Sequence, residues 1–304
     1  MILLLGGTGQ IGWELRRTLA PLGALSAPPR AECDLMHVDA IETLISRERP
    51  RMVVNAAAFT NVNAAEVEPA IAFRVNAHAV ARLAATLAEL GIPLVHFSTD
   101  YVFPGDATVP YVESDTLGPL NQYGRSKAAG ENAVRAAGGP HLILRTSWVY
   151  GARGSNFLTT IVERVARGNL VEVVSDQVGV PTWSRFAAEA CAHLCRSALE
   201  FLAAPEPGPG PLWGTYHMAP TGSTSWFGFA EYATRFLRIR GVSLPGMLRP
   251  VPTARRNDRV RRPRYSALSA RLLEAQFGLE MPPWEQSLEL MLEDALLRRG
   301  FQAG

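Results

Sequence analysis

Two residues spaced for proton chemistry lie in the middle of the chain, in the segment Tyr123-Gly-Arg-Ser-Lys127. Among 30 lysine and arginine residues, Lys127 is the single lysine, which indicates a task that arginine does not perform. A spacing of four places both side chains on one face of a helix, where an ammonium group lowers the pKa of a phenol from its usual value of about 10. We therefore predict that Tyr123 is a general acid for a ketone, with Lys127 as its partner.

A third hydroxyl group follows the apolar run Leu94–Ser98 directly. If this run is a strand of an open α/β sheet, Thr99 lies at its carboxyl end, where such sheets bind ligands. We expect Thr99 to donate a hydrogen bond to the substrate oxygen and to orient Tyr123. Ser98 is the alternative for this role.

A glycine-rich turn, Gly6-Gly7-Thr8-Gly9-Gln10-Ile11-Gly12, connects the apolar run Ile2–Leu5 to a helical segment. Glycines permit a tight turn and a close approach of the backbone to a pyrophosphate, and the helix amino terminus adds N–H donors and partial positive charge. The strand, turn and helix occur in the order that a dinucleotide site requires. The turn predicts a nicotinamide dinucleotide as the cofactor.

The choice between NADH and NADPH depends on the end of the second predicted strand, near Ala24–Ser26. This segment lacks the acidic residue that binds an adenosine 2′-hydroxyl, and Arg30 follows it. We expect NADPH to be accepted alongside NADH. Arg30 is a candidate for contact with the 2′-phosphate, and a solvated loop charge is the alternative.

Alternating apolar and amphipathic segments predict the elements that position these residues. Short apolar runs predict strands at Ile2–Leu5, Met52–Asn55, Leu94–Ser98 and Leu142–Arg145. Segments rich in Ala, Leu and Arg predict helices at Gln10–Leu22, Val67–Leu90 and Gln122–Ala137. Uniformly apolar strands separated by crossover helices indicate an α/β fold with a Rossmann-type, doubly wound parallel sheet.

The second half of the chain is less regular, which predicts a smaller and discontinuous C-terminal substrate domain. We expect helices at Asn156–Arg167, Ser184–Phe201, Trp226–Leu237 and Pro283–Arg298, and a surface loop at Ala203–Pro211. Two further runs, Val171–Ser175 and Trp213–His217, are predicted strands that rejoin the first sheet. Residues 1–150 would form the NAD(P)-binding domain, with segments near 170–217 returning to it, and residues 151–304 mainly the substrate domain.

The overall composition is that of an ordinary globular protein. A net charge of +2 gives no general attraction to nucleic acid or to a membrane. Three sparse cysteines argue against a disulfide framework, and the Cys191-Ala-His193-Leu-Cys195 cluster does not share one helix face, so no zinc site is predicted. Neither a signal segment nor an apolar run long enough for a membrane span is recognised, so we expect a cytoplasmic protein.

Together the glycine turn, Thr99 and the Tyr123–Lys127 pair resemble the extended short-chain dehydrogenase/reductase superfamily. Longer sequence motifs resemble the dTDP-4-dehydrorhamnose reductase family within this superfamily. They lie at Val54–Thr60, Phe97–Phe103, Arg145–Tyr150, Asp176–Thr182 and Arg261–Pro263. The resemblance implies the NAD(P)H-dependent reduction of dTDP-4-dehydro-β-L-rhamnose to dTDP-β-L-rhamnose. The substrate would be a nucleotide sugar.

The resemblance also implies roles for individual residues. Cofactor contacts would come from Tyr123, Lys127 and Arg30, from Gly6, Gly9, Gln10, Ile11 and Gly12 at the pyrophosphate, from Asp34 and Leu35 at the adenine, and from Ala56, Ala57, Ala58 and Thr60 between them. The sugar nucleotide would contact Thr99, Asp100, Trp148, Asn156 and Arg262.

For two features of the family, the sequence of this chain leaves open whether they are present. Some members carry a magnesium ion between subunits on glutamates, which makes Glu14, Glu189 and Glu289 candidates and a homodimer a possible assembly; exposed helix glutamates without metal are the commoner case. Where the family has Val-Asp-Lys-Ala-Glu, this chain has Val62-Asn63-Ala64-Ala65-Glu66. This departure removes a charge pair and leaves the local detail open.

The most basic stretch runs from Arg255 to Arg264 and includes Arg259. In this family context we expect it to bind the diphosphate of the nucleotide sugar, since arginine forks match phosphate oxygens. A solvated surface run is the alternative for half of these arginines. A nucleic-acid patch is disfavoured because no aromatic residues are interleaved.

Two other functions share these motifs. A nucleotide-sugar epimerase or dehydratase regenerates its nicotinamide in each cycle, so net consumption of NAD(P)H distinguishes it from a reductase. The regulatory subunit of methionine adenosyltransferase also resembles this family, and it acts as a partner protein. The presence of Tyr123, Lys127, Thr99 and Trp148 together favours catalysis.

Overall fold

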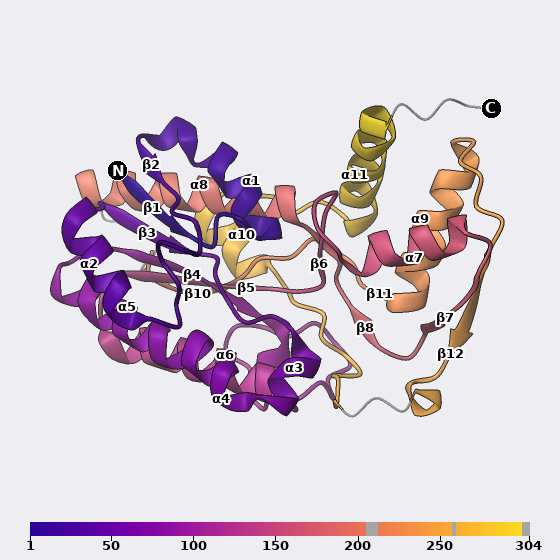
Figure 1. Cartoon of the computed structure of the whole chain (residues 1–304), viewed down its shortest axis with the longest axis horizontal. Coiled ribbons are helices and arrows are strands. Elements are labelled where there is room, and N and C mark those ends of the chain that lie inside the picture. The colour runs from indigo at the N-terminus through magenta and orange to yellow at the C-terminus, as the bar shows by residue number, and fades with distance from the viewer. Residues whose placement is uncertain (205–211, 257–259, 300–304) are drawn as a thin grey trace.

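The computed structural model describes residues 1–204, 212–256 and 260–299. Its centre is a parallel sheet of six strands in the order β10-β5-β4-β3-β1-β2 (Figure 1). The strands are β1 (Ile2–Leu5), β2 (Leu25–Ser26), β3 (Met52–Asn55), β4 (Leu94–Thr99), β5 (His141–Thr146) and β10 (Gly214–His217). The predicted doubly wound parallel sheet is confirmed.

Helices cover both faces of this sheet, which explains why its strands are apolar throughout. Ile2 and Leu4 pack on one side, while Leu3 and Leu5 pack on the other. The first side is covered by α1 (Gln10–Thr18), α8 (Ser184–Ala203) and α10 (Arg271–Phe277). The second side is covered by α2 (Val38–Glu48), α5 (Ala79–Glu89) and α6 (Gln122–Ala137).

A second hydrophobic core lies beyond the carboxyl ends of the central strands. Its helices are α7 (Phe157–Ala166), α9 (Trp226–Ile239) and α11 (Trp284–Arg299). Three small two-stranded sheets accompany them: β6 (Val149–Tyr150) with β9 (Thr182–Trp183), β8 (Val178–Gly179) with β11 (Thr224–Ser225), and β7 (Leu170–Val174) with β12 (Met247–Val251). We call this part of the molecule the second lobe.

The two strands predicted to rejoin the central sheet behave differently. β10 pairs in parallel with β5, with Gly214 opposite Leu142, so this prediction is confirmed. The corresponding prediction for Val171–Ser175 is wrong, because β7 pairs with β12 in the second lobe. An apolar run specifies a strand but does not specify its partner.

Most predicted helices are confirmed to within a few residues, but the segment Val67–Leu90 is not one regular helix. It contains α4 (Pro69–Phe73), a π-helical turn at Arg74–His78 and α5. Within this turn Asn76 uses its side chain to bind both backbone groups of Phe59 and the Ser126 hydroxyl on α6. The turn thus ties the loop after β3 to α6, which carries Tyr123.

Candidate active site

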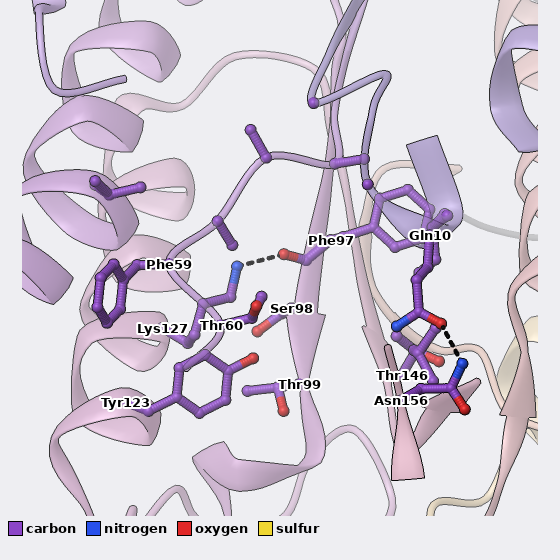
Figure 2. Close-up of a pocket in the computed structure, with 18 of the residues that line it drawn as sticks. Gln10, Phe59, Thr60, Phe97, Ser98, Thr99, Tyr123, Lys127, Thr146 and Asn156 are labelled. Carbon is purple, nitrogen blue, oxygen red and sulfur yellow. Dashed lines mark hydrogen bonds between the residues drawn. The ribbon is translucent and has the colours of Figure 1, made fainter. Parts of the chain in front are cut away.

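A cavity of about 700 Å³ opens at the carboxyl edge of the central sheet, between the sheet and the second lobe. Figure 2 shows Tyr123 and Lys127 on one helix with Thr99 facing Tyr123, and Gln10, Thr146 and Asn156 on the far side. All predicted cofactor and substrate residues line this cavity except Gly12 and Arg262. Residues that the sequence analysis gave no site role also line it, among them Phe59, Phe97, Tyr101, Thr146, Tyr150, Phe157, Trp226 and Phe229.

The glycine turn forms one end of the cavity. Gly6 has φ +81°, and a Cβ there would lie 2.6 Å from the Ala57 backbone nitrogen. Gly12 lies under the turn, where a Cβ would lie 2.0 Å from the Gly6 carbonyl oxygen. Gly9 lines the cavity and precedes α1, whose first turn has no side-chain cap, so backbone N–H donors face the cavity. Gly12 therefore has a packing role in the turn, and its predicted ligand contact stays a prediction.

Arg30 and Asp34 lie at the adenine end of the predicted dinucleotide site. The Arg30 Nε donates a hydrogen bond to Asp34 Oδ2 at 3.0 Å, and Asp34 Oδ1 accepts one from the Met36 N–H at 2.9 Å. The Arg30 side chain is 78% exposed and lines the cavity. An arginine in this position is accessible to a phosphate group on the ribose.

Helix α6 presents Tyr123 and Lys127 to the cavity. Asn121 caps the helix by accepting a hydrogen bond from the Gly124 N–H at 2.9 Å, which fixes where the helix begins. Burial raises the pKa of Tyr123 to about 12, and the hydrogen bond with Thr99 only partly offsets this. Lys127 Nζ donates to the Phe97 carbonyl at 2.5 Å (Figure 2). The predicted lowering of the phenol pKa is therefore wrong, because burial and the neighbouring Asp100 raise this pKa more than the hydrogen bond with Thr99 lowers it.

Thr99 and Ser98 point to different partners. The Thr99 hydroxyl donates to Asp100 Oδ1 at 3.0 Å and is hydrogen-bonded to Tyr123. The Ser98 hydroxyl donates to Glu131 Oε1 at 2.6 Å, inside the protein. This geometry favours Thr99 over Ser98 as the group that orients Tyr123, although its role with a substrate stays a prediction.

Asp100 is a buried carboxyl group at the base of the cavity. Burial raises its pKa to about 7, against the hydrogen bonds from Ser266 and Thr99 that favour the ionised form. Its Oδ2 has no hydrogen-bond partner among the described residues. Asp100 therefore keeps one buried carboxyl oxygen beside Thr99 without a hydrogen bond from the part of the chain that the structure describes.

Two stacked tryptophans form the wall of the cavity in the second lobe. The Trp148 and Trp226 rings are 3.5 Å apart with an interplanar angle of 8°. Trp148 has φ +44°, an unfavourable conformation for a residue with a side chain, and Gly179 leaves the space that its ring fills. Nearby, Asn156 caps α7 and donates from Nδ2 to the Gly151 carbonyl at 2.7 Å.

Arg262 lies outside the cavity lining. Its Nη2 donates to Asn63 Oδ1 at 3.0 Å, which connects a segment of the second lobe to α3 (Val62–Val67). The neighbouring Val62 lines the cavity, so Arg262 lies near its mouth. Of the basic stretch, residues 257–259, and with them Arg259, lie outside the described residues.

The three candidate magnesium ligands do not form a metal site. Glu14 and Glu189 both accept hydrogen bonds from Arg17, at 3.4 and 3.2 Å, and Glu289 accepts one from the Tyr232 hydroxyl at 2.5 Å. The described part of the chain contains no group of three or more His, Cys, Asp or Glu residues placed to hold a metal ion. The expectation of magnesium is not supported.

No helix in the described ranges is long and apolar enough to cross a membrane. The homodimer and the cellular location stay predictions.

The doubly wound sheet, the glycine turn and the Tyr–Lys pair define an oxidoreductase of the extended short-chain dehydrogenase/reductase class. The chain belongs to the dTDP-4-dehydrorhamnose reductase family, and a family model described as the RmlD substrate binding domain matches residues 1–297. The resemblance found in the sequence is confirmed.

Individual relatives match over nearly their whole length. A dTDP-4-dehydrorhamnose reductase from Burkholderia thailandensis is 41% identical over 299 residues, which cover 97% of this chain and 99% of the relative. The crystal structure of one from Clostridium acetobutylicum has a TM-score of 0.84 at 31% identity and covers 98% and 99% of the two chains. One from Bacillus anthracis, solved in complex with NADP, has a TM-score of 0.84 at 30% identity, with 96% and 98% covered.

Proposed function

We propose that this protein reduces the C4 ketone of dTDP-4-dehydro-β-L-rhamnose to give dTDP-β-L-rhamnose, with NADPH or NADH as the reductant. The observation that carries the proposal is one cavity lined by the glycine turn, Tyr123, Lys127 and Thr99. Family membership supports it, since the relatives in this family are named as reductases of this ketone. Fold alone would support only the class of enzyme.

The residues of the cavity fit a nicotinamide dinucleotide. A Cβ at Gly9 would meet only the Gly6 carbonyl, at 3.5 Å, so the turn leaves space beside Gly9, and the uncapped first turn of α1 offers N–H donors to a pyrophosphate. Such a cofactor supplies the hydride for C4 of the sugar. Because the second strand ends at Ser26 without an acidic side chain and Arg30 is accessible, we propose that NADPH is accepted as well as NADH.

The proton for the new hydroxyl group comes from Tyr123. Its raised pKa keeps the phenol protonated at neutral pH, which is the form that a general acid needs. Thr99 directs the phenol, and Lys127 lies on the same face of α6 to stabilise the phenolate that is left. We assign these three residues as the catalytic group.

The second lobe is proposed to bind the nucleotide sugar, so that residues 1–150, with segments near 170–217 returning to them, bind the cofactor and residues 151–304 mainly bind the substrate. Trp148 and Trp226 offer a flat apolar wall for the sugar ring, while Asp100 and Asn156 offer polar atoms. Arg262 would turn from Asn63 toward the diphosphate at the cavity mouth.

The test is the absorbance of NADPH or NADH after mixing each with the purified protein and dTDP-4-dehydrorhamnose generated in place. We expect stoichiometric loss of the cofactor band, reduced by a factor of roughly 100 or more in Tyr123→Phe, because general acid catalysis contributes about 10²–10⁴-fold. Tyr232→Phe, which changes a tyrosine bonded to Glu289 outside the cavity, is the matched control and should retain activity. Binding of NADPH without any net oxidation would contradict the reductase and favour an epimerase or a non-catalytic subunit.

A further inference from the structure

A chain of hydrogen bonds lies behind Lys127, on the side away from the cavity. It runs from Asn55 at the end of β3 to His96 in β4 and then to Lys127 Nζ. The three side chains are buried, with exposed fractions of 0%, 0% and 2%. Water therefore does not compete for their polar atoms, and each hydrogen bond restricts the next.

The orientation of the Asn55 amide is fixed from outside this chain. Its Oδ1 accepts a hydrogen bond from the Ala57 backbone N–H at 3.1 Å. Its Nδ2 must therefore face the other way, and it lies 3.2 Å from His96 Nδ1. An amide nitrogen only donates, so His96 Nδ1 accepts.

The tautomer of His96 follows from this direction. Burial lowers the pKa of His96 well below its usual value, and the neighbouring Lys127 lowers it further, so the imidazole is neutral. A neutral imidazole that accepts at Nδ1 carries its proton at Nε2. This Nε2–H lies 3.4 Å from Lys127 Nζ.

An ammonium group has no lone pair and cannot accept a hydrogen bond, whereas a neutral amine can. The Phe97 carbonyl accepts from Lys127 Nζ in either form, so it does not distinguish them. The Nε2–H of His96 does distinguish the two forms of Lys127. It can donate to the lone pair of the neutral amine, but it meets only N–H donors on the ammonium group.

The other titratable groups around Lys127 also affect its pKa. On α6 the Glu131 carboxylate favours the ammonium form but is itself bound by Arg145 and Arg135, and the Tyr123 phenol is neutral. At the end of β4, Asp100 has a pKa raised to about 7. The net result of burial against Glu131 is a Lys127 pKa of about 8.

We propose that Asn55 and His96 are positioning residues that present a fixed Nε2–H to Lys127 and thereby favour its uncharged amine. The inference rests on the proposed catalytic place of Lys127, but the tautomer itself does not. Asn55 and His96 are buried and do not line the cavity. In this proposal they help to set the proton affinity of Lys127.

Because Lys127 is the single lysine, lysine labelled with ¹³C at Cε or ¹⁵N at Nζ gives one side-chain NMR signal that needs no assignment. We expect this signal to titrate with a midpoint at about 8 in the native protein. In Asn55→Asp, one carboxylate oxygen still accepts from Ala57 and the other requires a proton on His96 Nδ1. His96 Nε2 then accepts from the ammonium, so the midpoint should rise by about 1–3 pH units.

The tautomer is read directly from the ¹⁵N shifts of the histidine rings in the unmodified protein, with His96→Gln identifying the signal. His217 is the internal reference, because its Nδ1 faces the Tyr111 carbonyl at 3.1 Å and its Nε2 faces Arg145 at 3.3 Å. We expect His96 to carry its proton at Nε2 and His217 at Nδ1.

A His96 proton at Nδ1 in the unmodified protein would overturn the inference, as would an unchanged Lys127 midpoint in folded Asn55→Asp. If Asn55→Asp does not fold, the tautomer in the unmodified protein decides. If the NMR measurements give the predicted tautomer and the predicted midpoint but the protein does not oxidise NADPH or NADH with the substrate, the proposed function is overturned and this inference stands. The same titration midpoint should appear as an alkaline limb in kcat/KM, displaced upward in Asn55→Asp.

Discussion

Asp100 shows how burial alone changes the chemistry of one residue. Its pKa in the folded state is about 7, against 3.8 as the usual value. Between these pH values the folded protein binds a proton that the unfolded chain has released, so stability falls as the pH rises. Asp100→Asn removes this proton uptake. The free energy of unfolding of the variant, measured relative to that of the unmodified protein, should therefore be about 2–3 kcal/mol higher at pH 8 than at pH 5.

Urea denaturation of both proteins at the two pH values measures this gain. Glu200→Gln, which removes an exposed carboxylate paired with Arg196 in α8, serves as the control and should change the free energy of unfolding by less than about 1 kcal/mol, because an exposed ion pair contributes little. An effect of Asp100→Asn that is equal at pH 5 and pH 8 would show that the carboxyl group is not titrating in this range.

At the residue scale the sequence pointed to the proposed reacting groups but not to their environment. Tyr123 and Lys127 could be found from residue type and spacing, since one lysine in the chain drew attention to the pair. The pKa of Tyr123 could not, because it depends on burial among segments that are distant in sequence. The same holds for His96, which is an ordinary strand residue until Asn55 and Lys127 are brought beside it.

At the scale of elements, the glycine turn offers a test that separates packing from ligand binding. A Cβ at Gly9 would meet only the Gly6 carbonyl at an ordinary 3.5 Å, whereas one at Gly12 would lie 2.0 Å from it. Gly9→Ala should therefore keep the Tm of the free protein but lose the Tm increase with NADPH, since the methyl group enters the pyrophosphate space. Gly12→Ala should lose about 1–3 kcal/mol of stability without any ligand.

Thermal unfolding with and without NADPH checks both variants. In the unmodified protein, NADPH at 100 times its Kd should add about 2.7 kcal/mol. A Gly9→Ala protein with the full NADPH shift would contradict the assignment of the turn to the pyrophosphate.

The predictability of elements follows the strength of their local pattern. β1 and β3 have the predicted bounds because four consecutive apolar residues are bracketed by turns. The π-helical turn at Arg74–His78 has no local signal, since it depends on the contacts of Asn76 with Phe59 and Ser126. β12 was not predicted because its mostly exposed Met247–Val251 includes a proline, which is typical of an edge strand.

At the scale of the whole molecule, the cavity is formed where two separately packed cores meet. The residues predicted to contact the cofactor come from several motifs in the first 127 residues, and all of them except Gly12 line the cavity. The opposite wall is made by residues such as Trp226, Phe157 and Phe229, which serve the second core as well. An aromatic residue that packs in a core and one that also lines a cavity look alike in a sequence, so these three residues were not predicted, although Trp148 and Asn156 beside them were.

The contact between Arg262 and Asn63 joins the two parts of the molecule at the mouth of the cavity. If Arg262 turns to the substrate diphosphate, Arg262→Ala should raise KM for the nucleotide sugar by roughly 10-fold or more, since a hydrogen bond to a charged group contributes about 1.5–3 kcal/mol. The Kd for NADPH should not change, because the cofactor end of the cavity is lined by other elements. Arg240→Ala, which removes an exposed arginine paired with Glu293, is the control and should leave both constants unaltered. Steady-state kinetics with NADPH titrations decide the matter: an unchanged KM would mean that Arg262 only links the lobes through Asn63.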